Sequence, residues 1–188
     1  MKRALRLFLV TVCLFLCVPL CSCGQRDKAS ALDVVLAMAD AQADCPAGDV
    51  YVLPDSYSLQ VINREYGTEQ RIRLTDDALI RAALGRTSSA DGEVWECSPA
   101  LVDDGALRLS TADSPCEFIV LRCISRSHTS KVADLLLHRL ELLRREYRAT
   151  DFEHILAHAQ VVIMEKYVML AVCTSPDHCI SVAKRALS

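Results

Sequence analysis

The sequence has few glycines, prolines and aromatic residues and no excess of basic charge. Glycine and proline number 6 each among 188 residues, which excludes a collagen-like or low-complexity chain. The formal net charge is −3, so the chain lacks the basic excess with which nucleic-acid binders neutralise phosphates, and we expect no nucleic-acid partner. Hydrophobic residues make up 52%, which is enough for a core, and the length suits a single domain.

Several catalytic motifs are also missing. The sequence contains no Gly-x-Ser-x-Gly elbow, no glycine-rich phosphate loop and no Cys-x-x-Cys pair. Its one tryptophan, Trp95, and its five tyrosines are too scattered to form a sugar-stacking platform. Asp103 and Asp104 are adjacent carboxylates, but in a predicted loop they are more typical of a solvated turn than of an acid–base pair. We therefore predict no catalytic residue, no bound cofactor and no enzymatic activity.

The start of the chain has the pattern of an export signal. Lys2, Arg3 and Arg6 form a basic segment, and the uncharged apolar run from Leu7 to Leu20 follows it. This run is shorter than the roughly 20 residues that a bilayer-spanning helix needs, and it contains a proline. It therefore resembles the hydrophobic region of a signal peptide more than a permanent anchor.

The signal ends in a segment that resembles a bacterial lipobox. Leu20 stands at position −3, Ser22 at −1 and Cys23 at +1, whereas Cys17 and Cys21 both follow a leucine and are poorer acceptors. The resemblance implies that residues 1–22 are removed and that Cys23 receives a diacylglyceryl group as the new N-terminus. An ordinary secretory signal and an uncleaved short anchor are the alternatives.

Lipidation at Cys23 would place the protein at the outer face of the cytoplasmic membrane. Removal of residues 1–22 leaves 18 basic and 24 acidic residues, a formal charge of −6, so anionic lipids give no electrostatic help and the acyl chains must provide the anchor. We predict a lipidated N-terminus and short tether over residues 23–29, of which residues 24–29 reach about 20 Å. Residues 30–188 form one domain.

The hydrophobic pattern predicts alternating helices and strands in that domain. Ser30 and Asp33 resemble a capping box at the start of a helix, and Ser175 followed by Pro176 marks another helix start. Helices are expected from Ser30 and over 57–66, 75–84, 127–148 and 176–187, and strands over 50–53, 94–95, 106–110, 116–124, 161–164 and 167–173. We predict a two-layer α+β fold with a mainly antiparallel sheet, in which the long amphipathic helix 127–148 and the C-terminal helix pack on one face.

The second half of the chain resembles an uncharacterised family of bacterial lipoproteins, domain of unknown function 4358, found in Clostridia and their relatives. The resemblance covers residues 106–188 best and is carried by the strand from Glu117 to Arg122, the helical stripe from Val132 to Leu143, and the hairpin strands that begin at Ala159 and at Tyr167. Glu165-Lys166 departs from the family, which often has glycine in that turn. The resemblance implies a membrane-tethered α+β domain and implies no activity.

Six cysteines remain after the signal and the lipidated residue are set aside. An even number of cysteines in an exported protein permits up to three disulfides. Cys97 with Cys116 is the first predicted pair, Cys173 with Cys179 is the second, and Cys123 lies in an apolar strand as a core residue. The pairing among all six stays open: Cys45, Cys97, Cys116, Cys123, Cys173 and Cys179.

Histidines offer two candidate metal clusters. His154 and His158 are spaced to share one face of a helix, which is a zinc-ligand spacing, but a third and fourth ligand are not evident. His178 could join Cys173 and Cys179 in a second cluster. Surface or capping roles are more common for histidines in such positions, so we predict no metal site.

These observations favour a non-catalytic binding or accessory module of the cell envelope, held to the membrane through Cys23, with an envelope protein as its partner. Such a module would present an exposed apolar patch or a flat edge strand. One alternative is a metal- or thiol-dependent cell-envelope enzyme. The other is an extracytoplasmic solute-binding component, although 166 residues are few for the usual two-lobed form.

Overall fold

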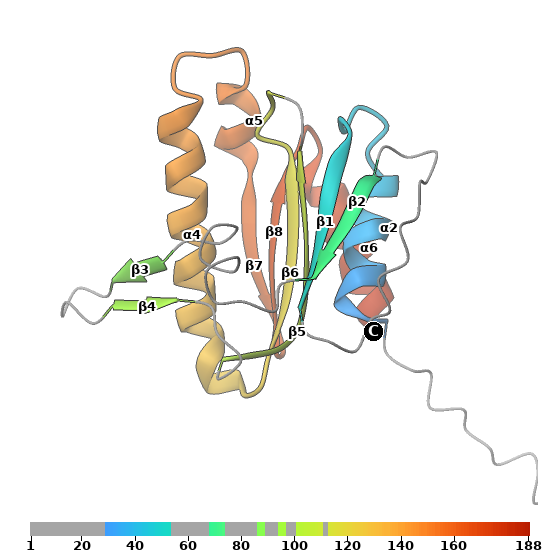
Figure 1. Ribbon diagram of the computed structural model, residues 1–188, viewed down its shortest axis with the longest axis vertical. Helices are drawn as coiled ribbons and strands as arrows, with labels where there is room; N and C mark the ends of the chain where they lie inside the picture. Colours follow the sequence, from blue (N-terminus) through green and yellow to red (C-terminus); the bar gives the residue numbers. More distant parts are fainter. Residues whose placement is uncertain (1–28, 54–67, 74–85, 89–93, 97–100, 111–112) are drawn as a thin grey trace, which may run out of the picture.

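The computed structural model describes residues 29–53, 68–73, 86–88, 94–96, 101–110 and 113–188, and its centre is a six-stranded sheet (Figure 1). The strands, in chain order, are β1 (Gly48–Leu53), β2 (Thr68–Arg73), β5 (Val102–Ser110), β6 (Glu117–Cys123), β7 (Gln160–Met164) and β8 (Tyr167–Val172). Their order across the sheet is β2-β1-β5-β6-β8-β7. The β1–β2 pair is parallel and all other neighbours are antiparallel. The predicted α+β class and mainly antiparallel sheet are therefore confirmed.

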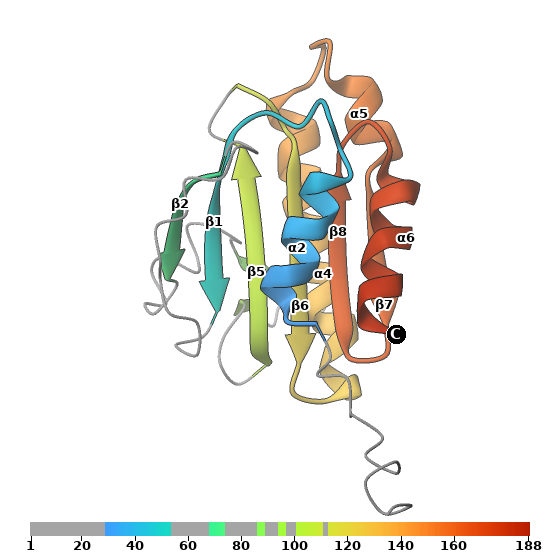
Figure 2. The same ribbon diagram turned by 90° about the vertical axis from the view of Figure 1, so that its right-hand side faces the viewer.

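Helices cover both faces of this sheet. On one face lie α2 (Ala31–Asp40) and α6 (Pro176–Leu187), and on the other lie α4 (Thr129–Glu146) and the short α5 (Glu153–His158) (Figures 1 and 2). A 3₁₀ turn, Arg126–His128, precedes α4. The short strands β3 (Arg86–Ser88) and β4 (Val94–Glu96) form a separate antiparallel pair. The described residues thus form three layers.

The prediction that the long helix and the C-terminal helix share one face, in a two-layer fold, is wrong. The reason lies in the central strands, whose side chains are apolar on both sides. In β6, Ile119 and Leu121 pack in the core beneath α4, while Phe118 and Val120 pack in the core beneath α2 and α6. All six residues of β8 are buried. A strand that is apolar on both faces needs helices on both faces.

The helix boundaries follow the predicted capping signals. The Ser30 hydroxyl accepts a hydrogen bond from the Asp33 N–H at 3.1 Å, and the Asp33 carboxylate accepts one from the Ser30 N–H at 3.2 Å, which confirms the capping box of α2. In α6, Pro176 occupies the first turn, and Ser175 makes no side-chain cap bond. The predicted apolar stripe of the long helix is buried along α4, with Tyr147 half-buried just beyond its end.

Some strands differ from the prediction. β2 was not expected, and β5 begins four residues earlier than predicted, with Gly105 inside it. A Cβ at Gly105 would lie 2.8 Å from Cδ2 of Leu121, so a larger residue there would require the Leu121 side chain to shift. The helices predicted over 57–66 and 75–84 lie outside the described residues. Among the described helices, none has the length and apolar character needed to cross a membrane.

Candidate functional site

The end of the sheet at which β5 and β8 finish and β6 begins brings four cysteines together. Cys116 directly precedes β6, and Cys173 directly follows β8. Cys45 lies in the loop between α2 and β1, and Cys179 lies in the first turns of α6. Because antiparallel neighbours alternate in direction, residues far apart in sequence meet at this one end, the upper end in Figure 2.

Three of these cysteines line a small pocket, which we call the thiol pocket. Its volume is about 80 Å³, and Cys45, Cys116 and Cys173 contribute to its wall. The remaining lining side chains come from the loop after α2, from α5 and its preceding turn, and from the segments flanking β6 and β8: Gln42, Asp44, Pro46, Ser114, Phe152, Ile155 and Thr174. The pocket is far below the 300 Å³ or more typical of small-molecule sites, so it suits one side chain or a few atoms rather than a metabolite.

A buried arginine stands behind the pocket. Arg108 of β5 is 1% exposed, and its Nη1 donates a hydrogen bond to Sγ of Cys45 at 2.9 Å. Its Nη2 donates to the carbonyl oxygen of Pro46. Gly48 of the neighbouring strand leaves room for this side chain, because a Cβ there would lie 3.3 Å from the Arg108 Cζ and 2.5 Å from the carbonyl oxygen of Leu109. The pairing of β5 with β1 thus places the positive charge of Arg108 beside Cys45.

This environment favours the thiolate of Cys45. Hydrogen bonding by the Cys116 thiol, together with the positive charge of Arg108, outweighs the opposing effect of burial and lowers the pKa of Cys45 to about 7. The same hydrogen bond, with burial, raises the pKa of Cys116. The thiolate is therefore favoured at Cys45 and disfavoured at Cys116, and the thiolate is the reactive form of cysteine.

Cys173 and Cys179 form a second thiol pair beside the first. Their sulfurs are 3.6 Å apart, so the structure brings this predicted pair together as free thiols. The Cys179 thiol also donates to the carbonyl oxygen of Met38 in α2 at 3.5 Å. Hydrogen bonding between the two lowers the pKa of Cys173 and raises that of Cys179.

The other cysteine predictions have mixed outcomes. Cys97, the first predicted partner of Cys116, lies outside the described residues, and Cys116 lines the same pocket as Cys45. No local sequence pattern predicts that arrangement, because it depends on the course of the loop after α2. Cys123 is fully buried in the core beneath α4, as predicted, and burial raises its pKa to about 11.

The predicted histidine clusters are not assembled as metal sites. His154 and His158 both lie exposed on α5, where Nδ1 of His154 is 2.6 Å from the carbonyl oxygen of Asp151. His178 is exposed while the adjacent Cys179 is buried, so the two side chains point to different sides of α6. Within the part of the chain that the structure describes, no group of three or more His, Cys, Asp or Glu residues is arranged to hold a metal ion.

The adjacent carboxylates of β5 do not face one another. Asp103 is exposed and pairs with Arg122, with Oδ1 2.7 Å from Nε. Asp104 is buried, and its Oδ2 accepts a hydrogen bond from the N–H of Ala31 at 3.1 Å, at the positive end of α2. One carboxylate thus belongs to a surface ion pair and the other secures a helix terminus, and neither arrangement is an acid–base pair.

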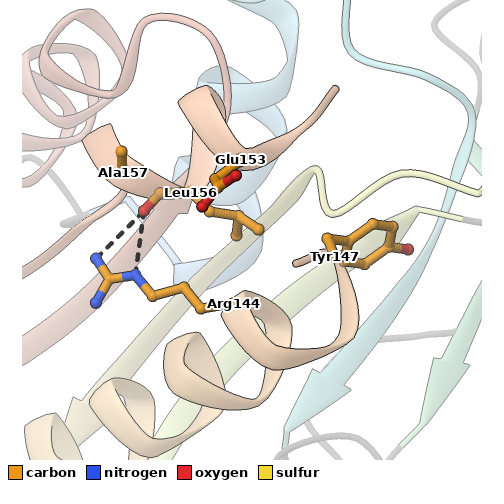
Figure 3. A pocket seen from close by; sticks show the side chains of 5 residues that line it. All are labelled: Arg144, Tyr147, Glu153, Leu156 and Ala157. Carbon is orange, nitrogen blue, oxygen red and sulfur yellow. Dashed lines mark hydrogen bonds between the residues drawn. The ribbon is translucent and has the colours of Figure 1, made fainter. Parts of the chain in front are cut away.

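A second pocket, of about 220 Å³, lies between α4 and α5 (Figure 3). Arg144, Tyr147, Glu153, Leu156 and Ala157 line it. Nε and Nη2 of Arg144 both donate to the carbonyl oxygen of Leu156, at 3.3 and 3.2 Å. This guanidinium therefore joins the end of α5 to α4, which is a structural role.

A comparison with protein-family models, with curated proteins and with solved structures finds no match to this chain. The predicted lipidation residue, Cys23, lies outside the described residues. The thiol pocket and its arginine are thus identified by their geometry alone. Within the described residues, the thiol pocket and Arg108 combine reactive thiols with a buried positive charge.

Proposed function

We propose that the protein is an extracytoplasmic lipoprotein, anchored to the membrane through Cys23, that serves as a non-catalytic accessory module for another protein of the cell envelope. The lipobox-like segment before Cys23 supports the anchor. The resemblance to domain of unknown function 4358 agrees with this location and assigns no activity, and it stays a prediction. The structural observation that carries the accessory role is the open edge of the sheet at β7.

Strand β7 has the features of an edge that accepts another strand. Within the described residues it is the end strand and pairs with β8 alone. Its five residues include no charged residue and no proline, which are the usual protections of an exposed edge. Ile163 is 48% exposed on this strand. An extended segment of a partner could add to β7 through main-chain hydrogen bonds.

The opposite edge of the sheet differs in composition. β2 includes Glu69, Arg71 and Arg73, and charged residues on an edge strand disfavour pairing with another chain. The two edges are therefore not equivalent in sequence. This contrast favours β7 over β2 as the edge that receives a partner.

The pockets agree with a binding role more than with solute capture. The two described cavities, of about 80 and 220 Å³, are both smaller than typical small-molecule sites. Neither of these two cavities therefore favours the alternative of a solute-binding component. The thiol-dependent alternative is favoured by one specific contact, that of Arg108 with Cys45.

The edge can be tested with two matched variants of the full lipoprotein. Ile163→Lys places a charge on β7, and Leu137→Lys places the same charge at a position of α4 with similar exposure, 46%. Crosslinking in native membranes, followed by pull-down, should recover one stoichiometric envelope partner with the wild type and with Leu137→Lys. Ile163→Lys should lose it.

Equal recovery with both lysine variants would contradict the role of β7, and the absence of any partner of the wild type would contradict the accessory role itself. Circular dichroism of both variants checks that they fold. Since both substituted side chains are about half exposed to a similar extent, the two changes should alter the free energy of unfolding by similar, small amounts of about 0.5 kcal/mol.

A further inference from the structure

We propose that the thiol pocket is a thiol–disulfide exchange site, in which Cys45 attacks a disulfide of another molecule and Cys116 resolves the resulting mixed disulfide. This activity adds a stoichiometric reaction with a disulfide to the non-catalytic accessory role proposed above, and of that proposal it rests only on the extracytoplasmic location. The substrate class is a disulfide, either of a small thiol compound or of an exported protein. Both are expected in an oxidising compartment outside the cytoplasm.

Cys45 is the one of the four cysteines that is suited to attack first. It is only partly buried, whereas Cys116, Cys173 and Cys179 are all buried, so an incoming disulfide reaches Cys45 most easily. Its sulfur accepts a hydrogen bond from the guanidinium of Arg108. That charge stabilises the thiolate that must form before attack, and a thiol whose pKa lies near the ambient pH is the best attacking group in exchange.

Arg108 has no other counter-ion in the described part of the chain. Its two hydrogen bonds go to Sγ of Cys45 and to the carbonyl oxygen of Pro46. A buried cation is stabilised most by a nearby negative charge. Ionisation of Cys45 therefore places a negative charge against the buried guanidinium, and the two groups stabilise one another.

Cys116 is placed to complete the reaction. It lies in the wall of the same small pocket as Cys45 and is protected from direct attack by burial. The two cysteines thus meet at one pocket although 70 residues separate them in the sequence. A buried, protonated thiol beside a mixed disulfide has the position of a resolving cysteine.

The reaction balances without any further oxidant. The Cys45 thiolate attacks one sulfur of the substrate disulfide RS–SR, which forms a Cys45–SR bond and releases RS⁻. Cys116 then gives its proton to solvent and attacks Sγ of Cys45, which forms the Cys45–Cys116 disulfide and releases a second RS⁻. The two cysteines lose two electrons, and the substrate disulfide gains them.

The thiol pocket lies at the end of the sheet opposite the first described residues. Those residues are at the end of α2 where Ala31 contacts Asp104, near the start of β5. Figure 2 shows that α2 runs from this end of the sheet to the end at which β5 finishes. The loop and strand ends that carry Cys45 and Cys116 are at that second end, about 15 Å further along the helix and the strand.

The experiment uses the full-length lipoprotein, purified in detergent and fully reduced, with oxidised glutathione as the probe. Samples are quenched with acid and N-ethylmaleimide, and the modified peptides are identified by mass spectrometry. In the wild type, a Cys45–Cys116 disulfide should form with two equivalents of glutathione released. In Cys116→Ser, the glutathione adduct should accumulate on Cys45, and in Cys45→Ser, Cys116 should stay unmodified over the same period.

Cys179→Ser is the matched control, because it removes a neighbouring buried thiol and should leave the Cys45–Cys116 reaction unchanged. Circular dichroism of each variant checks the fold. First modification of a cysteine other than Cys45, or a wild-type product that joins Cys45 or Cys116 to Cys97, would overturn the proposal. Because β7 is intact in all these variants, such a result would leave the proposed accessory role unaffected. Conversely, the partner-capture experiment with Ile163→Lys does not test the exchange activity, because the thiol pocket is intact in that variant.

Discussion

Replacement of Arg108 by methionine tests the physical basis of the thiol pocket most sharply. Methionine has a similar length and no charge, so Arg108→Met removes both the hydrogen bond to Cys45 and the positive charge behind it. Burial, which opposes ionisation, remains. Hydrogen bonding by Cys116, the largest cause of the lowering, also remains. The pKa of Cys45 should therefore rise from about 7 part of the way towards its ordinary value of 9.0, which is taken as the largest rise.

The size of the effect on reaction rate follows from two opposing changes. At pH 7, a rise of the pKa to 9.0 lowers the thiolate fraction about 50-fold. A more basic thiolate is also a better nucleophile, and a Brønsted coefficient of about 0.45 over this range gives a gain of about eightfold. For that largest rise, Cys45 of the variant would react with oxidised glutathione about sixfold more slowly than wild type at pH 7, and a smaller rise gives a smaller decrease in rate.

The difference should change sign with pH. At pH 10 both thiols are ionised, so the variant should react up to about eightfold faster than the wild type, and the two rate profiles should cross near about pH 8. The assay is the initial rate of glutathione addition to Cys45 between pH 5 and 10, followed by mass spectrometry. Arg108→Lys retains the charge and is the control, with a midpoint closer to that of the wild type. Identical pH profiles for wild type and Arg108→Met would refute the stabilisation of the thiolate by Arg108.

Two further predictions concern stability. Arg139 donates to both carboxylate oxygens of the buried Glu117, at 3.2 and 2.9 Å. Arg139→Met should therefore lower the free energy of unfolding, measured in urea, by about 3 kcal/mol or more. The double variant with Glu117→Gln should recover most of this lost stability. Burial raises the pKa of Glu117 despite the neighbouring Arg139, so the folded state binds the proton of this carboxyl more tightly than the unfolded state does. The Arg139→Met variant should therefore become more stable as the pH falls from 7 towards 5. A loss of stability on acidification would contradict this expectation. Ala149 has a φ of 60°, which glycine adopts more readily, so Ala149→Gly should raise the free energy of unfolding by up to about 1 kcal/mol. Ala157→Gly, within α5, should lower the free energy of unfolding by about 0.5–1 kcal/mol. A change of the same sign in both variants would refute the role of backbone conformation.

Local signals in the sequence predicted most of the described elements. The capping box at Ser30, the stripe of α4 and the hairpin of β7 and β8 depend on residues close in sequence, and all three are found. The placement of the helices was harder, because it depends on which face each helix covers. The fully apolar run of β8 indicated that both faces are covered, but it does not say which helix goes to which face.

The thiol pocket could be predicted only in part. Cys173 and Cys179 are six residues apart across one turn, so their contact was foreseen from spacing. Cys45 and Cys116 meet only because the loop after α2 reaches the end of β5, and no local pattern encodes such a contact. Arg108 is an arginine within a short apolar strand, and its burial depends on the pairing of β5 with β1 and on the space left by Gly48.

The membrane anchor on Cys23 is the claim on which the proposed location and partner both depend. Mass spectrometry of the N-terminal peptide of protein purified from its native membranes tests it directly. The account predicts a chain that begins at Cys23 and carries a diacylglyceryl group on its sulfur, and a Cys23→Ala variant that lacks the lipid. A chain that retains residues 1–22, or one that is cleaved and carries no fatty acid, would contradict it.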